Sequence, residues 1–304
     1  MYNSYMRSFI INKNYDNIKI YNVIKKYFPN LSISALNKAF RKKDIKVNDS
    51  HIDKDYIVHI DDVVKLYIPD NVLFKIPDNV YYAYEDENIL VAYKPKGIET
   101  TAFDKQNSNN MIYFDTIIKK LKGENLEVCH RLDINTEGLV IFTKNSKAKD
   151  AMLDGFKNNS IHKIYLAAIY KNTPKKHDIL KNYITTRNGF SKISDKPSKD
   201  SKECITEYTN IYHINDLSIL SIVLHTGRTH QIRAVMKYLN HPIIGDPKYS
   251  TNEINDKFKL YSQVLYAAKY EFSFHKGSFL EYLNDISIDY SKEILDKIYF
   301  LLKL

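Results

Sequence analysis

The sequence contains no tryptophan, only two cysteines, and no apolar run that approaches the length of a membrane span. Because Cys129 and Cys204 do not form a CxxC pair, the sequence offers neither a disulfide framework nor the usual spacing of a zinc site. The N-terminus also lacks the apolar core and the cleavage site of a signal peptide. From these absences we expect a cytoplasmic protein with two reduced thiols and no contact with a membrane.

Glycine is scarce as well, with 8 glycines in 304 residues, and no segment resembles a loop that cradles the phosphates of a nucleotide cofactor. No group of metal-binding residues has a recognisable spacing, so we expect neither a cofactor nor a metal. Basic residues, by contrast, are in excess: 45 lysines and arginines face 36 acidic residues, which gives a formal net charge of +9. Such a charge favours an anionic partner.

Residues 1–68 form the first expected domain. Apolar residues recur there at helical spacing in two stretches, and two short alternating runs follow: Val23, Ile24 and Phe28, then Leu36 and Phe40, then 45–48 and 63–66. Two helices with a basic flank before a small sheet resemble an S4 domain, a small RNA-binding module. The resemblance implies that Arg41 and Lys42 contact RNA. The residues leave a second interpretation open, in which the basic helix face is only solvated.

Residues 69–80 contain two prolines and indicate an extended linker, because proline removes a backbone donor and blocks helix formation. A larger second domain is expected over residues 81–304. It opens with an apolar strand at residues 89–93, which ends in a Lys-Pro-Lys-Gly turn that begins at Lys94.

A dense polar motif stands just before an apolar run, residues 139–142, that is typical of a buried strand. The motif places His130 and Arg131 directly before Leu132-Asp133, and Glu137 follows four positions later. A carboxylate held between cations next to a rigid strand suits a catalytic group. The motif therefore makes Asp133 a candidate catalytic residue.

A second dense motif, TGRTHQIR, occupies residues 226–233 and leads into a helix with an apolar stripe. The sequence HPIIGDPKY follows it at residues 241–249. Between the two dense motifs, a strand at residues 163–169 carries Tyr165 in a K-x-Y-x-A pattern. A lone strand tyrosine usually packs in a core, so only this pattern singles out Tyr165.

Over about residues 81–275, these motifs resemble those of the RluA-type RNA pseudouridine synthases. The resemblance implies an α+β fold, with a mixed, mostly antiparallel central sheet and flanking helices behind the S4-like domain. It implies that Asp133 is the essential carboxylate, that Arg233 holds it charged through a bidentate contact, and that Tyr165 stacks on the target uracil. The implied RNA contacts are His130, Arg131, Arg228, His230, Lys94 and Lys248.

Several positions depart from the pattern of that family, among them Glu99-Thr100-Thr101 in place of the usual Val-His ending and Val235 in place of a histidine. Tyr93 replaces the usual asparagine, Glu137 the usual serine, and Tyr266 the usual histidine. For two of the histidines the residues leave alternatives open. His130 either orders the motif loop or contacts phosphate, and His230 either braces its turn or contacts RNA.

A pseudouridine synthase breaks the C1′–N1 bond of uridine and rebuilds it to C5, so the chemistry requires no cofactor, and the base must flip out of its stack. The expected substrate is large-subunit ribosomal RNA, with transfer RNA as the alternative, and we expect a monomer. Whether Asp133 acts as a nucleophile or as a base at the ribose stays open. Two other functions compete: an RNA-folding protein without chemistry, and a glycosidase with Glu137 as its second carboxylate.

Overall fold

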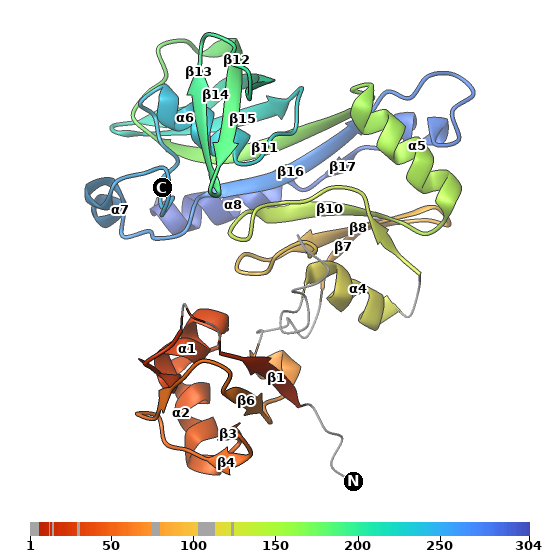
Figure 1. Cartoon of the computed structure of the whole chain (residues 1–304). Helices are drawn as coiled ribbons and strands as arrows, with labels where there is room; N and C mark the ends of the chain where they lie inside the picture. The colour runs from red at the N-terminus through yellow and green to blue at the C-terminus, as the bar shows by residue number, and fades with distance from the viewer. Residues whose placement is uncertain are drawn as a thin grey trace. The chain divides into compact units, whose positions relative to one another are not determined.

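The computed structural model describes residues 6–73, 80–102, 113–122 and 125–304, apart from residues 12, 14, 29 and 30. The chain divides into two compact units (Figure 1). Met1–Val80 and Gly97–Gly123 make up the first unit, and Tyr81–Lys96 and Glu124–Leu304 make up the second.

The expected linker is only partly visible, because residues 74–79 lie outside the described part of the chain. Where we expected extended chain, the structure has a single helical turn, α3 (Asp70–Leu73). Pro69 stands directly before the first residue of this turn, where a missing backbone N–H removes no helical hydrogen bond. The proline therefore begins a short helix here instead of preventing one.

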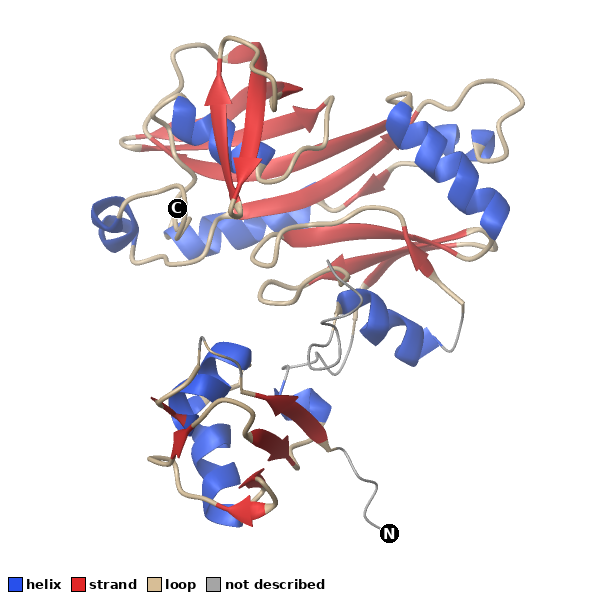
Figure 2. Cartoon of the chain, in the orientation of Figure 1, coloured by secondary structure: helices blue, strands red, loops and turns tan. Residues whose placement is uncertain are grey.

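The first unit combines short helices with a small sheet of strand order β1-β6-β3-β4 (Figure 2). Ser32 caps α2, as its side chain accepts a hydrogen bond from Ala35 N, and Leu36 and Ala39 face the core from this helix. The described elements of the unit, besides α3, are β1 (Arg7–Ile10), β2 (Ile18–Lys19), α1 (Ile20–Tyr27), α2 (Ile33–Lys42), β3 (Ile45–Val47), β4 (Ser50–His51), β5 (Ile57–Val58), β6 (Val63–Leu66) and α4 (Phe114–Lys122).

The second unit is built on one large sheet, whose main path runs β13-β12-β14-β15-β11-β16-β10-β8-β7. Its described elements are β7 (Tyr82–Glu85), β8 (Ile89–Lys94), β9 (Glu127–Val128), β10 (Glu137–Thr143), α5 (Ser146–Lys157), β11 (Ile161–Tyr170), β12 (His177–Arg187), β13 (Phe190–Ser194), β14 (Lys202–Ile214), β15 (Leu217–Leu224), α6 (Gln231–Tyr238), α7 (Asn252–Phe258), β16 (Leu265–Phe272), η2 (Glu281–Asp285), β17 (Ile288–Asp289) and α8 (Ser291–Leu302).

Nearly all neighbouring strands of this sheet are antiparallel, and the pairing of β10 with β16 is parallel. Helices lie against the sheet in Figure 2, so the mixed, mostly antiparallel α+β architecture expected for the catalytic domain is confirmed. The strand β16 stands between β11 and β10, and it is therefore the strand that joins the two halves of the sheet.

Strand β10 explains why the polar motif before it is held rigidly. Every residue of β10 is buried, and Leu139 and Ile141 pack in an apolar core with Met152 of α5. Gly138 has a φ of +122°, and a Cβ at this position would lie 2.2 Å from the carbonyl oxygen of Ala267 in β16. Only glycine permits this backbone conformation and this close approach of the two strands.

A second apolar core lies where α8 covers the sheet, with Ile294 and Ile298 packed against Leu166 and Ala168 of β11. In the described ranges, no helix combines the length and the apolar character that a membrane span requires.

Candidate active site

Asp133 lies in the loop between β9 and β10, where its backbone carbonyl accepts a hydrogen bond from Thr136 N at 3.0 Å. Its side chain is 23% exposed, so the carboxylate is reachable from outside the protein. Two further bonds fix the loop around it. Lys94 Nζ donates to the carbonyl of Ile134 at 3.2 Å, and Gln263 Nε2 donates to Thr136 Oγ1 at 2.9 Å.

Arg233 binds Asp133 and also a second carboxylate that the sequence analysis did not single out. Its Nη1 donates to Asp133 Oδ2 at 2.8 Å. Its Nε and Nη2 donate to the two carboxylate oxygens of Asp246, at 2.7 and 3.0 Å. The predicted contact between Arg233 and Asp133 is thus present, but the bidentate geometry predicted for it belongs to Asp246 instead.

The Arg233–Asp246 pair is buried, with side-chain exposures of 6% and 0%. Burial alone would lower the pKa of Arg233, but the hydrogen bonds and charges of Asp246 and Asp133 outweigh it and raise that pKa. Asp246 also accepts the backbone N–H groups of Lys248 and Tyr249, which fixes the loop 246–249 around the guanidinium. The arginine is therefore oriented toward Asp133 before any substrate arrives.

The second dense motif delivers Arg233 through a turn that ends in helix α6. Gln231 ties this turn together: its Oε1 accepts from Thr226 Oγ1 and Arg228 N, and its Nε2 donates to Thr206 Oγ1. His230 precedes the helix with a φ of +55°, a backbone conformation that histidine tolerates better than β-branched residues do. This tight turn places Arg233 on the buried side of α6.

His230 approaches the Asp133 carboxylate from its position before α6. Its Nε2 lies 3.8 Å from Asp133 Oδ2, and its Nδ1 lies 2.9 Å from the hydroxyl of Tyr249. Burial lowers the pKa of His230 more than the charge of Asp133 raises it, so the imidazole is neutral at pH 7. Tyr249 also accepts Ser191 N at 2.8 Å and presents its ring to Arg233 at 4.9 Å.

Tyr165 projects from β11 close enough to Asp133 for the two groups to interact electrostatically. Its side chain is buried, at 7% exposure. Burial raises the pKa of the Tyr165 hydroxyl, and the negative charge of Asp133 adds to the effect. Within the described residues no side chain forms a hydrogen bond with this hydroxyl. The structure therefore brings together all three predicted catalytic residues, Asp133, Tyr165 and Arg233.

Lys94 does not occupy the exposed position that a phosphate contact requires. It is fully buried in β8, and its Nζ donates to the carbonyls of Pro95 at 2.9 Å and Ile134 at 3.2 Å. The prediction that it contacts RNA does not fit this position. We infer that Lys94 supports the loop that carries Asp133.

The other predicted RNA contacts differ in position. His130 Nε2 accepts Ile141 N at 3.0 Å, so this ring orders the motif loop against β10. Arg228 is exposed, and its Nε donates to the carbonyl of Glu203 at 3.1 Å, which braces the turn. Arg131 is exposed one residue after His130. Lys248 is exposed on the Asp246 loop, and its Nζ donates to Gly189 O at 2.9 Å.

Glu137 is not placed to act as a second catalytic acid. It is 5% exposed, and its carboxylate binds Lys297 of helix α8. The hydroxyl of Tyr93 lies 3.4 Å from Glu137 Oε2, and Lys96 Nζ lies 3.9 Å from its Oε1. The negative charge of Glu137 is thus balanced by Lys297 and Lys96 of the same protein. The glycosidase hypothesis, which needs Glu137 as its second carboxylate, loses its support.

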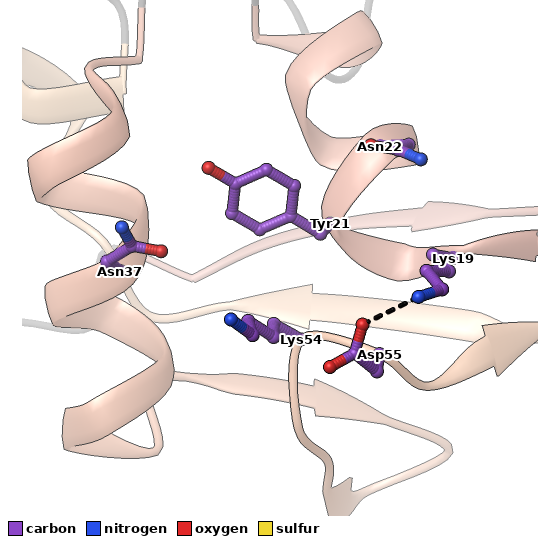
Figure 3. A pocket seen from close by; sticks show the side chains of 6 residues that line it. All are labelled: Lys19, Tyr21, Asn22, Asn37, Lys54 and Asp55. Carbon is purple, nitrogen blue, oxygen red and sulfur yellow. Dashed lines mark hydrogen bonds and ion pairs between the residues drawn. The ribbon is translucent and has the colours of Figure 1, made fainter.

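The first unit contains a separate polar hollow of about 380 Å³. In it, Lys19 Nζ donates to Asp55 Oδ1 at 2.8 Å, and Figure 3 shows the Tyr21 ring in the middle of the group. The hollow is lined by Lys19, Tyr21, Asn22, Asn37, Lys54 and Asp55. The predicted RNA contacts Arg41 and Lys42 are exposed in the last turn of α2.

Asp246, Tyr249 and Gln231 are site residues that the sequence analysis did not single out. All three lie inside the motifs TGRTHQIR and HPIIGDPKY, so the signal was present, but their side chains act on other protein groups rather than on a substrate. In the ranges that the structure describes, no group of three or more histidine, cysteine or acidic side chains could hold a metal ion.

The chain is similar in sequence to known proteins. Residues 88–238 match the family model described as RNA pseudouridylate synthase. An uncharacterized RNA pseudouridine synthase of Mycoplasma capricolum is 32% identical and aligns over 92% of this chain and 96% of its own length. Ribosomal large subunit pseudouridine synthase C of Rickettsia felis is 31% identical over 76% of this chain and 81% of its own length.

The fold has solved counterparts as well. Human RNA pseudouridylate synthase domain containing 1 superimposes with a TM-score of 0.54 at 20% identity, over 64% of this chain and 79% of the human chain. At this identity the likeness concerns the fold alone.

Proposed function

Because this chain belongs to the RNA pseudouridine synthase family and is therefore an isomerase that acts on RNA, we propose that Asp133 is the carboxylate that acts on the target uridine. One observation carries the proposal. Asp133 is a reachable carboxylate whose oxygen accepts Arg233 Nη1 at 2.8 Å, while Asp246 holds the same arginine from behind. The fixed guanidinium orients the Asp133 carboxylate and offsets its negative charge.

The reaction breaks the C1′–N1 bond, forms a C1′–C5 bond, and moves one proton from C5 to N1. Asp133 starts it in one of two ways: it attacks C1′ and forms a covalent ester, or it takes a proton from C2′. Both routes require an ionised carboxylate, and both return it unchanged at the end. Arg233 serves each route equally, because it fixes the position of the Asp133 carboxylate.

Tyr165 holds the uracil in this proposal. Since the pKa of its hydroxyl is raised, the side chain stays protonated near pH 7 and presents a neutral aromatic face. Base–aromatic stacking of this kind contributes roughly 1–3 kcal/mol per base. Because Tyr165 is 7% exposed, only a uridine that has left its stack can reach it, so we propose base flipping.

We propose large-subunit ribosomal RNA as the substrate, with transfer RNA as the alternative. The Rickettsia felis relative, which bears the name of a ribosomal large subunit enzyme, supports the first choice. We further propose that the enzyme works as a monomer, because every residue of the proposed active site comes from one unit of one chain. We place it in the cytoplasm, where the ribosomal RNA that we propose as its substrate is found.

We also propose that the first unit binds RNA in the manner of an S4 domain. Exposed Arg41 and Lys42 at the end of α2 support this, and so does the polar hollow, where Tyr21 offers a ring and Lys19 and Lys54 offer ammonium groups. Aromatic and cationic side chains on one surface are what single-stranded RNA requires.

The test uses the full chain with transcripts of large-subunit ribosomal RNA and of transfer RNA, and maps pseudouridine by carbodiimide-dependent primer-extension stops. We expect new stops in ribosomal RNA with the wild type and none with Asp133→Asn, whose RNA affinity stays within about twofold of the wild type. Stops that persist with Asp133→Asn would refute the proposed role of Asp133. Stops in transfer RNA alone would select the alternative substrate.

A non-catalytic RNA-binding protein on the same fold is the competing hypothesis. It predicts that neither RNA acquires stops even with the wild-type chain. It is disfavoured because Asp133, Tyr165 and Arg233 are all present and are brought together in one unit.

A further inference from the structure

Lys163 is a partly buried cation that the proposed mechanism does not use. It stands on β11 two residues before Tyr165, so both side chains project from the same face of the strand. Its Nζ lies 5.2 Å from the ring centroid of Phe156, and burial lowers its pKa. Across the described part of the chain, no carboxylate pairs with this ammonium and no acceptor hydrogen-bonds it.

His130 presents a second donor near it, because the His130 ring lies 5.4 Å from the ring of Phe156, against which the Lys163 ammonium also lies. Because Nε2 accepts the backbone N–H of Ile141, the neutral ring carries its proton on Nδ1. Burial first, and then the positive charge of Lys163, lower the pKa of His130 to about 3, so the ring is neutral at pH 7. No described residue accepts a hydrogen bond from Nδ1.

The two donors belong to the surroundings of Asp133. His130 precedes this aspartate by three residues in the same loop. A Cβ at Gly227, in the second dense motif, would lie 3.2 Å from Lys163 Nζ, so the ammonium also lies against that motif. The absence of a side chain at Gly227 leaves this side of the ammonium open.

We propose that Lys163 and the Nδ1–H group of His130 form a phosphate-binding site for the backbone of the target uridine. The proposal rests on the proposed function, because it takes RNA as the ligand. An unpaired, partly buried cation is unfavourable, and an incoming anion removes this penalty. A phosphodiester oxygen suits both groups, since it accepts a charge-assisted hydrogen bond from the ammonium and a second one from the imidazole.

The first experiment measures how the affinity for a decauridylate RNA depends on salt, with the full-length protein. Lys163→Met keeps the aliphatic packing against Phe156 and removes the charge. We expect its log affinity to fall less steeply with log salt, by roughly 0.7 in slope, as for the loss of one phosphate contact in a single strand. At about 0.1 M salt the affinity should fall roughly tenfold, and Lys163→Arg should restore most of it.

The matched control is Lys257→Met. This lysine is exposed and already paired with Asp216 at 2.6 Å, so its loss should leave the slope unchanged.

Thermal unfolding distinguishes a phosphate-binding role of Lys163 from a role in packing alone. Lys163→Met should raise the unfolding temperature, because an unpaired cation leaves the interior. A lower unfolding temperature together with an unchanged slope would mean that Lys163 only packs, and the site would be refuted.

The second experiment titrates inorganic phosphate into 15N-histidine-labelled protein and follows the ring resonances of His130 by NMR. We expect a saturable shift in the wild type and none in Lys163→Met. No saturable shift in the wild type, or the same shift in both proteins, would overturn the site. Neither experiment depends on catalysis, so a failure here differs from a failure of the proposed role of Asp133, which the primer-extension assay reports.

Discussion

Glu137 and Lys297 are 160 residues apart in the chain, yet they form an ion pair between the first residue of β10 and helix α8. Glu137 is opposite Tyr266 in the register of β10 with β16, and its other neighbour is the hydroxyl of Tyr93. Glu137, Tyr266 and Tyr93 are three of the positions at which this sequence departs from the family pattern. These three departures form one cluster, which Lys297 completes.

Loss of Lys297 should destabilise the second unit, because it leaves Glu137 buried without its cation. For Lys297→Met we expect the free energy of unfolding to fall by about 2 kcal/mol, less than for a fully buried pair because Lys297 is 40% exposed. Chemical denaturation measures this change in the free energy of unfolding. The double variant Glu137→Gln/Lys297→Met should recover most of the loss, and simple additivity of the two changes would contradict the pairing.

Asp246 should behave as a positioning residue for catalysis. Asp246→Asn removes the charge behind Arg233, and we expect kcat to fall roughly 10²-fold with little change in KM, because the guanidinium loses its orientation toward Asp133. The matched control is Asp216→Asn, at an exposed pair with Lys257, which should leave kcat within about twofold of the wild type. A fall in kcat that matches a loss of folded protein by circular dichroism would indicate a structural role only.

The close approach of β10 to β16 makes a steric prediction. Gly138→Ala should lower the free energy of unfolding by more than about 3 kcal/mol, because its Cβ would collide with the backbone of Ala267. Gly277 provides the control: it has a φ of +82° but no atom within 4 Å of a built Cβ, so Gly277→Ala should lower the same free energy by about 1 kcal/mol. Equal effects from the two substitutions, measured by urea denaturation, would contradict the argument.

The buried ring of His130 should make stability depend on pH. Its pKa is about 3 in the folded protein against 6.5 for an ordinary histidine, so the unfolded chain binds the proton more tightly. The stabilisation is therefore fully present above about pH 6.5 and is lost as the pH falls toward 3, by on the order of 2–4 kcal/mol. Urea denaturation at pH 7.5 and pH 5 should show a smaller loss for His130→Gln than for the wild type. The same loss in both proteins would exclude His130 as the cause.

The sequence motifs predicted the contact of Asp133 with Arg233 through their resemblance to the family, since charge alone does not select one of the 45 lysines and arginines. They could not assign the bidentate contact to Asp246, since this depends on how the loop 246–249 folds back onto α6. Lys94 shows the same limit. At the end of an apolar strand it resembles an exposed cation, but in the fold its Nζ donates to the carbonyls of Pro95 and of Ile134, the latter forty residues later.

The parallel pairing of β10 with β16 also determines when the site can form. Strands β7, β8 and β10 connect with β11 and the strands beyond it only through β16, which follows Asp133 by more than a hundred residues. During synthesis, Asp133 therefore emerges on one half of the sheet and Tyr165 and Arg233 on the other. We expect the halves to stay separate until residues 265–272 have left the ribosome. A nascent chain that stops earlier should carry all three proposed catalytic residues without an assembled site.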